Sequence, residues 1–256
     1  KRMIIRGATL INGTGSPPIG PVDIVIENNR ITEVKSVGYP NVPINEKKRP
    51  KKGDFEIDAS GHYVLPGFVD MHGHAGSVQK APETDYVYKL WLAHGVTTVR
   101  GVGLGSLEFS LKEKIRSKSN EITAPRIWAY QRPGQGKDWK GGAIKDPQNA
   151  RKWVRYAANK GVDGLKLVSY EPSIMNALID EAKKQKLGTT AHLGQTGVAR
   201  MNTIDAARLG LGTQTHFYGL FESMYEANDV QPYPVDMNYN NEQDRFGQVA
   251  RQWSLV

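Results

Sequence analysis

Two histidines stand one residue apart in the stretch FVDMHGHAG, residues 68–76 of a 256-residue chain. In a β-strand, alternate side chains point to the same face, so the imidazoles of His72 and His74 can converge on one point. Such convergence is typical of a metal site, since imidazole is a common ligand of transition metals. The alternative is a pair of ordinary polar residues where a strand enters a loop.

Two further histidines follow predicted strands later in the chain, His192 in TTAHLGQ and His216 in TQTHFYG. The carboxyl ends of parallel strands in a barrel meet at one rim, so we expect these side chains to lie near His72 and His74. Four of the six histidines would then gather there. One histidine at a strand end is usually an ordinary polar residue, whereas four on three strands favour a metal site.

Lys166 lies in the middle of the apolar run VDGLKLV. Parallel barrel strands are buried on both faces, so an unpaired ammonium there is costly or loses its proton. A neutral amine can react with carbon dioxide to form a carbamate, whose oxygens are able to bridge two metal ions. Two simpler interpretations stay open: the lysine extends to the rim, or it pairs with an acid such as Glu171.

From residue 66 onward, predicted strands and helices alternate, which is typical of parallel βα units. VTTVRGV (Val96–Val102) and RIWAYQ (Arg126–Gln131) are predicted as the second and third strands. The next three predicted helices lie in DPQNARKWVRYAANKG, SIMNALIDEAKKQKLG and NTIDAARLGLG, each of which ends in glycine. We expect a left-handed C-cap at each, and a site at the carboxyl ends of the strands.

The domains are predicted as an N-terminal β-sandwich part over residues 1–65 and a barrel over residues 66–256. Residues 3–37 show period-two patterning with a turn at Asn28-Asn29, which predicts a small antiparallel sheet. Residues 54–67 are expected to add a hairpin-like pair of strands. The predicted fold class is α/β: a (β/α)8 TIM-like barrel, of which about six βα units are visible, plus the small β-sandwich.

Composition excludes several other classes of protein. The absence of cysteine excludes thiolate metal sites, disulfides and cysteine nucleophiles. The net charge is +8, but the clearest basic cluster is the short run KKRPKK, so we expect no nucleic-acid partner. No stretch approaches the ~20 apolar residues of a membrane span. The start at Lys1 fits a removed signal peptide or a trimmed chain, and an extracytoplasmic location is slightly favoured over the cytoplasm.

The ordered motifs PGFVDMHGH, DGLKL, TAHLG and QTHFYG, preceded by ATLINGTG, resemble the metal-dependent amidohydrolase superfamily up to about Gly219. The branch indicated is the binuclear one with a carboxylated lysine, near prolidase-like and imidazolonepropionase-like enzymes. HGVTTVRGVG matches the second-strand region, although many relatives have an acid where this chain has Gly101.

The resemblance implies five metal ligands. His72 and His74 would hold the first ion, His192 and His216 the second, and carbamylated Lys166 would bridge them. Two divalent ions are implied, with zinc as the default because imidazole and carboxylate-like oxygen suit it, while manganese, iron and cobalt stay open. A hydroxide shared by both ions would be the nucleophile, since metal binding lowers the pKa of water to about 7.

One residue of the family pattern has no counterpart: an aspartate at the end of strand eight, which binds metal and shuttles a proton. The tail after Leu220 is polar and turn-rich, and no apolar strand precedes its Asp229 or Asp236. No catalytic residue is therefore assigned. We expect the barrel to be incomplete at the C-terminus, with the remainder in a longer protein or in another polypeptide.

The leading interpretation is a hydrolase that cleaves an amide C–N bond of a small substrate, such as a dipeptide or cyclic amide. Two alternatives stay open: a catalytically silent barrel fragment that acts as a binding protein, and a hydrolase of esters, lactones or phosphoesters. The expected partner is a small molecule, with no membrane contact, and homo-oligomers are common in this class. Position alone suggests that Tyr130, Arg132, Tyr170 and Tyr218 contact the substrate.

Overall fold

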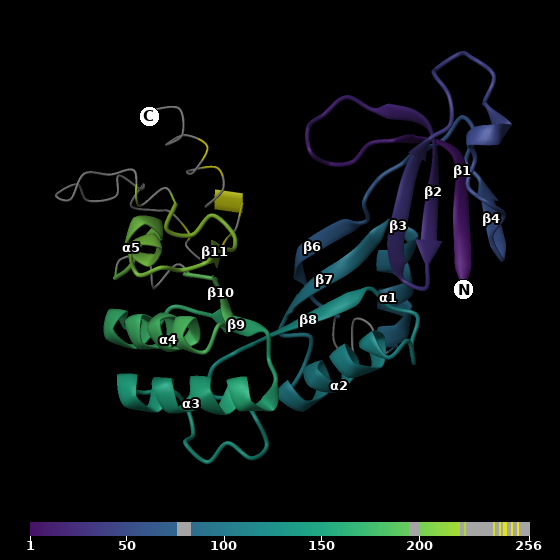
Figure 1. The fold of residues 1–256 in the computed structure, drawn as a ribbon. Helices are drawn as coiled ribbons and strands as arrows, with labels where there is room; N and C mark the ends of the chain where they lie inside the picture. Colours follow the sequence, from purple (N-terminus) through teal and green to yellow (C-terminus); the bar gives the residue numbers. More distant parts are fainter. Residues whose placement is uncertain are drawn as a thin grey trace. The chain divides into compact units, whose positions relative to one another are not determined.

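The structure is a computed structural model, which describes residues 1–75, 83–194 and 200–220, together with residues 223, 238, 241, 243, 244, 247 and 250 (Figure 1). The chain divides into two compact units, Lys1–Gly67 and Phe68–Val256, and each is described by itself. No helix in the described part is both long enough and apolar enough to cross a membrane.

The N-terminal unit is built on a five-stranded sheet with a short 3-10 helix, η1 (Glu46–Lys48). Its strands are β1 (Arg2–Leu10), β2 (Ile19–Glu27), β3 (Arg30–Ser36), β4 (Phe55–Asp58) and β5 (Tyr63–Val64). β1 and β2 pair antiparallel, as do β2 and β3. Asn28 joins β2 to β3 with a φ of 58°, a conformation that asparagine tolerates, and this confirms the predicted turn.

The expected hairpin between residues 54 and 67 is wrong. β4 and β5 both pair parallel with β1, β4 beside Met3–Arg6 and β5 beside Thr9–Leu10. Between them the chain makes a local turn, in which Ser60 N donates to the Asp58 carboxylate and His62 N donates to Ala59 O. A turn that interrupts one strand and a turn that reverses the chain use the same polar residues, so only the partner strand distinguishes them.

In the second unit, the described residues form a six-stranded parallel sheet in the order β11-β10-β9-β8-β7-β6. The strands are β6 (Phe68–Gly73), β7 (Val96–Val102), β8 (Arg126–Gln131), β9 (Gly164–Leu167), β10 (Gly188–Ala191) and β11 (Thr213–Gln214). The helices are α1 (Thr84–Ala93), α2 (Leu107–Lys118), α3 (Pro147–Lys160), α4 (Pro172–Lys184) and α5 (Thr203–Arg208). The sheet curls, with α2, α3 and α4 along one side (Figure 1). This half-barrel wall and the separate N-terminal sheet confirm the predicted α/β class.

Capping residues set the helix limits. Asp146 accepts a hydrogen bond from Asn149 N at the start of α3, and Gly161 ends that helix with a φ of 94°, as predicted. Gly210 follows α5 with a φ of 90°. The expected glycine cap of α4 is wrong, because Lys186 takes the positive φ of 58°. Gly188 instead begins β10, where a Cβ atom would lie 2.0 Å from the Tyr130 hydroxyl, so glycine is needed there for packing.

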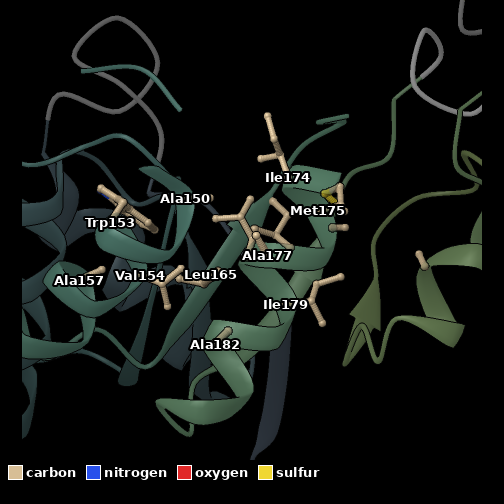
Figure 2. Close-up of a cluster of buried hydrophobic side chains, with 14 of the residues drawn as sticks. Ala150, Trp153, Val154, Ala157, Leu165, Ile174, Met175, Ala177, Ile179 and Ala182 are labelled. Atoms are coloured by element: carbon tan, nitrogen blue, oxygen red, sulfur yellow. The ribbon is translucent and has the colours of Figure 1, made fainter. Parts of the chain in front are cut away.

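The main core lies between α3, β9 and α4. In Figure 2, Val154 of α3 lies beside Leu165 of β9, with Ala177 of α4 on the other side, and all three side chains are buried. Burial of a large apolar side chain contributes roughly 1.5–3 kcal/mol. This packing fixes the backbone of β9 and with it the position of Lys166.

Candidate metal centre

The structure brings the four rim histidines together. His72 is the second-last residue of β6 and His74 directly follows that strand. His192 follows β10, and His216 lies two residues beyond β11. The ring centroids of His74 and His72 are 5.0 Å apart, those of His72 and His216 4.9 Å, and those of His216 and His192 4.7 Å. The four imidazoles therefore form a continuous cluster, although the first pair of histidines lies more than a hundred positions from the second in sequence.

His216 reaches this cluster through an unusual backbone conformation, with a φ of 65°. A residue other than glycine rarely adopts the left-handed region, and when it does so the conformation costs about 1–3 kcal/mol. Packing of its ring against His72 and His192 accompanies this strain. Strain of this kind gathers at functional sites, where surrounding contacts hold the residue in place.

Lys166 is buried beside the histidines, with 2% of its surface exposed. Its Nζ donates to Thr215 Oγ1 at 3.0 Å and lies 3.5 Å from His72 Nε2. The Thr215 hydroxyl in turn donates to Ala191 O at 3.0 Å. Neither simpler interpretation describes this lysine: it does not extend to solvent, and Glu171 pairs with Arg200 instead.

Burial shifts the protonation of these groups. It lowers the pKa of His72 to about 4, with further lowering by the charge of Lys166. Burial also lowers the pKa of His74, although a hydrogen bond with the Gly103 backbone opposes that shift. The pKa of Lys166 falls to about 8 because of burial and then the charges of Arg132 and Arg100. At neutral pH, both imidazoles of the HxH pair are thus uncharged and able to act as ligands.

The donor types fit divalent metal ions, whereas the side-chain geometry is not that of a formed site. In the described part of the chain, no group of three or more His, Cys, Asp or Glu side chains is arranged to hold a metal ion. The imidazoles pack edge to face instead, at interplanar angles of 60–69°. Imidazole is nevertheless a donor type that suits zinc and related ions.

Of the four predicted substrate residues, Tyr218 lies beside the histidines and Tyr130 lies away from them. Tyr218 stacks on His192 with ring centroids 4.8 Å apart, and the half-buried Tyr170 packs against the main core. Arg132 follows β8, and among the described residues no acidic side chain pairs with its guanidinium. Tyr130 lies away from the histidines, because its ring packs against Gly164 and Gly188 at the starts of their strands.

Arg100 of β7 is a buried residue near the histidines that sequence reasoning missed. Its Nε donates to Met71 O at 2.6 Å, and its guanidinium also reaches two threonines of β10 and β11. The signal was present in VTTVRGV, where a charged residue interrupts an apolar strand. The same argument that singled out Lys166 applies to Arg100.

No family model matches the chain. Among curated proteins, the dihydroorotase of Thermoanaerobacter sp. (strain X514) is 40% identical over 73 residues, which cover 28% of this chain and 14% of that protein. The adenine deaminase of Bacillus subtilis (strain 168) is 37% identical over 83 residues, which cover 30% of this chain and 14% of that protein. The similarity thus spans about a seventh of the length of these relatives.

Solved structures share the fold over most of the chain. A Xaa-Pro dipeptidase with bound methionine has a TM-score of 0.64 at 22% identity, covering 84% of this chain and 61% of that one. Phenylurea hydrolase B has a TM-score of 0.64 at 16% identity, covering 85% and 60% respectively. The chain therefore spans about three fifths of these neighbours. Together with the sequence relatives, they confirm the predicted resemblance to the amidohydrolase superfamily.

Proposed function

We propose that the protein hydrolyses an amide C–N bond of a small substrate, such as a dipeptide or a cyclic amide. The observation that carries this proposal is the continuous histidine cluster beside buried Lys166 at the carboxyl ends of the parallel strands. The names of the relatives, which include a dihydroorotase, adenine deaminases, a Xaa-Pro dipeptidase and a phenylurea hydrolase, support C–N hydrolysis in general.

The histidines would hold two divalent ions, His72 and His74 one and His192 and His216 the other. Such ions, when bound, supply an activated water and polarise the substrate carbonyl. The protein contributes neutral imidazoles, since burial lowers the pKa of His72 to about 4. It also keeps water away from the Lys166 amine, which is 2% exposed.

Lys166 is the residue suited to bridge the two ions after carbamylation. With a pKa of about 8, roughly one tenth of the amine is neutral at pH 7. The neutral nitrogen would attack carbon dioxide, so that a C–N bond forms, one C=O π bond opens to give the carbamate oxygen, and the nitrogen loses one proton to solvent. Thr215 aligns the amine for this step, because its hydroxyl lies 3.0 Å from Nζ and is itself fixed by Ala191 O.

Arg132 supports a substrate with an anionic group. Its guanidinium follows β8 at the carboxyl end of the sheet, and its charge acts on Lys166, where it lowers the pKa. No described acidic side chain pairs with this guanidinium, and the carboxylate of a dipeptide would supply the missing anion. The Tyr218 ring, stacked on His192, offers an apolar surface at the histidine cluster.

Zinc stoichiometry of the purified chain, combined with a hydrolysis panel on the full-length protein, tests the proposal. After equilibration with Zn²⁺ and bicarbonate, we expect two zinc ions per chain and, in the full-length protein, cleavage of dipeptides or cyclic amides in preference to esters and phosphotriesters. His72→Ala and His192→Ala should each lose zinc. His94→Ala is the matched control, because His94 caps α1, where its ring bonds to Leu90 O. Equal zinc in all four proteins, or none in the wild type, would refute the proposal.

A further inference from the structure

Arg100 connects β7 to four other strands of the sheet. Besides the bond from Nε to Met71 O in β6, its Nη1 donates to Thr213 Oγ1 in β11 at 2.8 Å and its Nη2 to Thr190 Oγ1 in β10 at 3.3 Å. Its Cζ lies 5.2 Å from the ring centroid of Tyr130 in β8. Only 7% of the residue is exposed, so these contacts are shielded from solvent.

The contact with β6 falls on the peptide that immediately precedes His72. Arg100 binds the carbonyl of this peptide at Met71, and the Asp70 carboxylate accepts a hydrogen bond from the His72 amide at 2.8 Å. The β6–β7 register is irregular between Asp70 and Gly73, so strand pairing does not hold this peptide. Two side chains therefore fix both of its polar ends, and with them the direction in which the His72 side chain leaves the strand.

The contacts with β10 and β11 lie just before the other two rim histidines of those strands. Thr190 precedes His192 by two residues, and Thr213 precedes His216 by three. A single planar guanidinium thus links the backbone before His72 to both strands. Lysine could not replace it, because an ammonium lacks the rigid fork of donors that reaches several acceptors at once.

We propose that Arg100 is the positioning residue of the histidine cluster: its guanidinium sets the position of His72 relative to His192 and His216. This inference rests on the proposed function, because it takes the histidines as metal ligands. Arg100 acts through the peptide and the threonines and touches no reacting atom.

A titration with Co²⁺, followed by the visible absorption of the bound ion, tests the inference. Arg100→Lys keeps the positive charge but loses the fork, and we expect Co²⁺ affinity to fall about 10- to 100-fold, as for other residues that orient metal ligands. The shape of the absorption band should change as well, since it reports the coordination geometry. Thr213→Val, which removes a single acceptor, should give a smaller loss of affinity and keeps the test available if Arg100→Lys does not fold.

Lys114→Met is the matched control. Lys114 also links separate elements, since its Nζ donates from α2 to Gly161 O at 3.0 Å and to Asp163 Oδ1 at 2.7 Å, but it does so before the start of β9. It should lower the melting temperature and leave Co²⁺ affinity and spectrum unchanged. Unchanged affinity in the folded Arg100→Lys and Thr213→Val variants would overturn the inference. An equal loss in Lys114→Met would do so too, because the effect would then be general destabilisation.

Amide hydrogen exchange of the metal-free chain separates this inference from the proposed function. A wild-type chain that binds no Co²⁺ would refute the metal centre, yet the backbone contact could still be measured. Positioning by Arg100 predicts faster exchange of the His72 amide in Arg100→Lys than in the wild type or Lys114→Met. The same exchange rate in all three proteins would contradict it.

Discussion

Buried positive charge is compensated differently in the two units of this protein. In the N-terminal unit, Arg6 Nη1 lies 2.9 Å from the Asp23 carboxylate and Arg6 Nη2 lies 2.5 Å from that of Glu56. In the second unit, Arg100 and Lys166 are more deeply buried than Arg6, and no described acidic side chain forms an ion pair with either. Their hydrogen bonds go to threonine hydroxyls and a backbone carbonyl.

The pKa values record the same difference. The hydrogen bond from Arg6 lowers the pKa of Glu56 and, in return, Glu56 raises the pKa of Arg6. Burial and neighbouring cations instead lower the pKa of Lys166 to about 8. The first arrangement stabilises the charges that it contains. The second leaves an excess of positive charge, which suits a place where an anionic carbamate or substrate is to be held.

The largest effect on stability is expected when the N-terminal ion pair is broken. Asp23 is completely buried, and its other oxygen accepts from Gly7 N at 2.8 Å. Asp23→Asn should lower the free energy of unfolding by about 3–5 kcal/mol, because it leaves buried donors without their partner. Urea denaturation measures this loss. Glu27→Gln, at the exposed pair with Arg2, should lower the unfolding free energy by at most about 1 kcal/mol. Equal losses in the two variants would show that the buried pair at Asp23 stabilises the unit no more than an exposed one.

Removal of the uncompensated charge of Lys166 should have the opposite effect on the free energy of unfolding. Lys166→Met replaces a buried amine with an apolar chain of similar length, so we expect unfolding free energy to stay the same or rise by about 1 kcal/mol. The same variant should lose zinc, because no bridging carbamate can form. Thermal melting and zinc analysis of one preparation measure both. Strong destabilisation by Lys166→Met would show that the lysine serves the fold and not the site.

The smallest effect is a difference in acid sensitivity. The pKa of His72 in the folded chain is about 4, below its ordinary value of 6.5. Between pH 6.5 and pH 4 the unfolded chain therefore binds more protons than the folded chain, and stability is lost as the pH falls through that window. Glu56 has a lowered pKa as well, but its contribution is lost only below about pH 4.5. Urea midpoints of metal-free protein at pH 7 and pH 5 should therefore differ less in His72→Asn than in the wild type. A pH dependence identical in both would be inconsistent with a neutral, buried His72.

Local signals predicted much of the second unit. The strands at Val96–Val102 and Arg126–Gln131 and the cap at Gly161 could be read from the sequence because apolar runs and capping residues act over a few positions. The rim histidines could be predicted as neighbours because parallel strands align their carboxyl ends. Their ligand roles stay a prediction.

Long-range partners were the part that sequence could not supply. β4 and β5 pair with β1 and not with each other, and nothing in residues 54–67 specifies that choice. Gly188 resembles a helix cap, yet its role depends on Tyr130, which is distant in sequence. The place of Arg100 in an apolar strand could be read locally, but its acceptors on β6, β10 and β11 could not.

Anomalous scattering at the zinc edge, from crystals grown with Zn²⁺ and bicarbonate, would show whether these histidines bind metal. We expect two zinc peaks within the cluster, one beside His72 and His74 and one beside His192 and His216, with carbamate density on Lys166 between them. Crystals that show no peak among these histidines, or an unmodified Lys166 still bonded to Thr215 in zinc-loaded protein, would contradict this expectation.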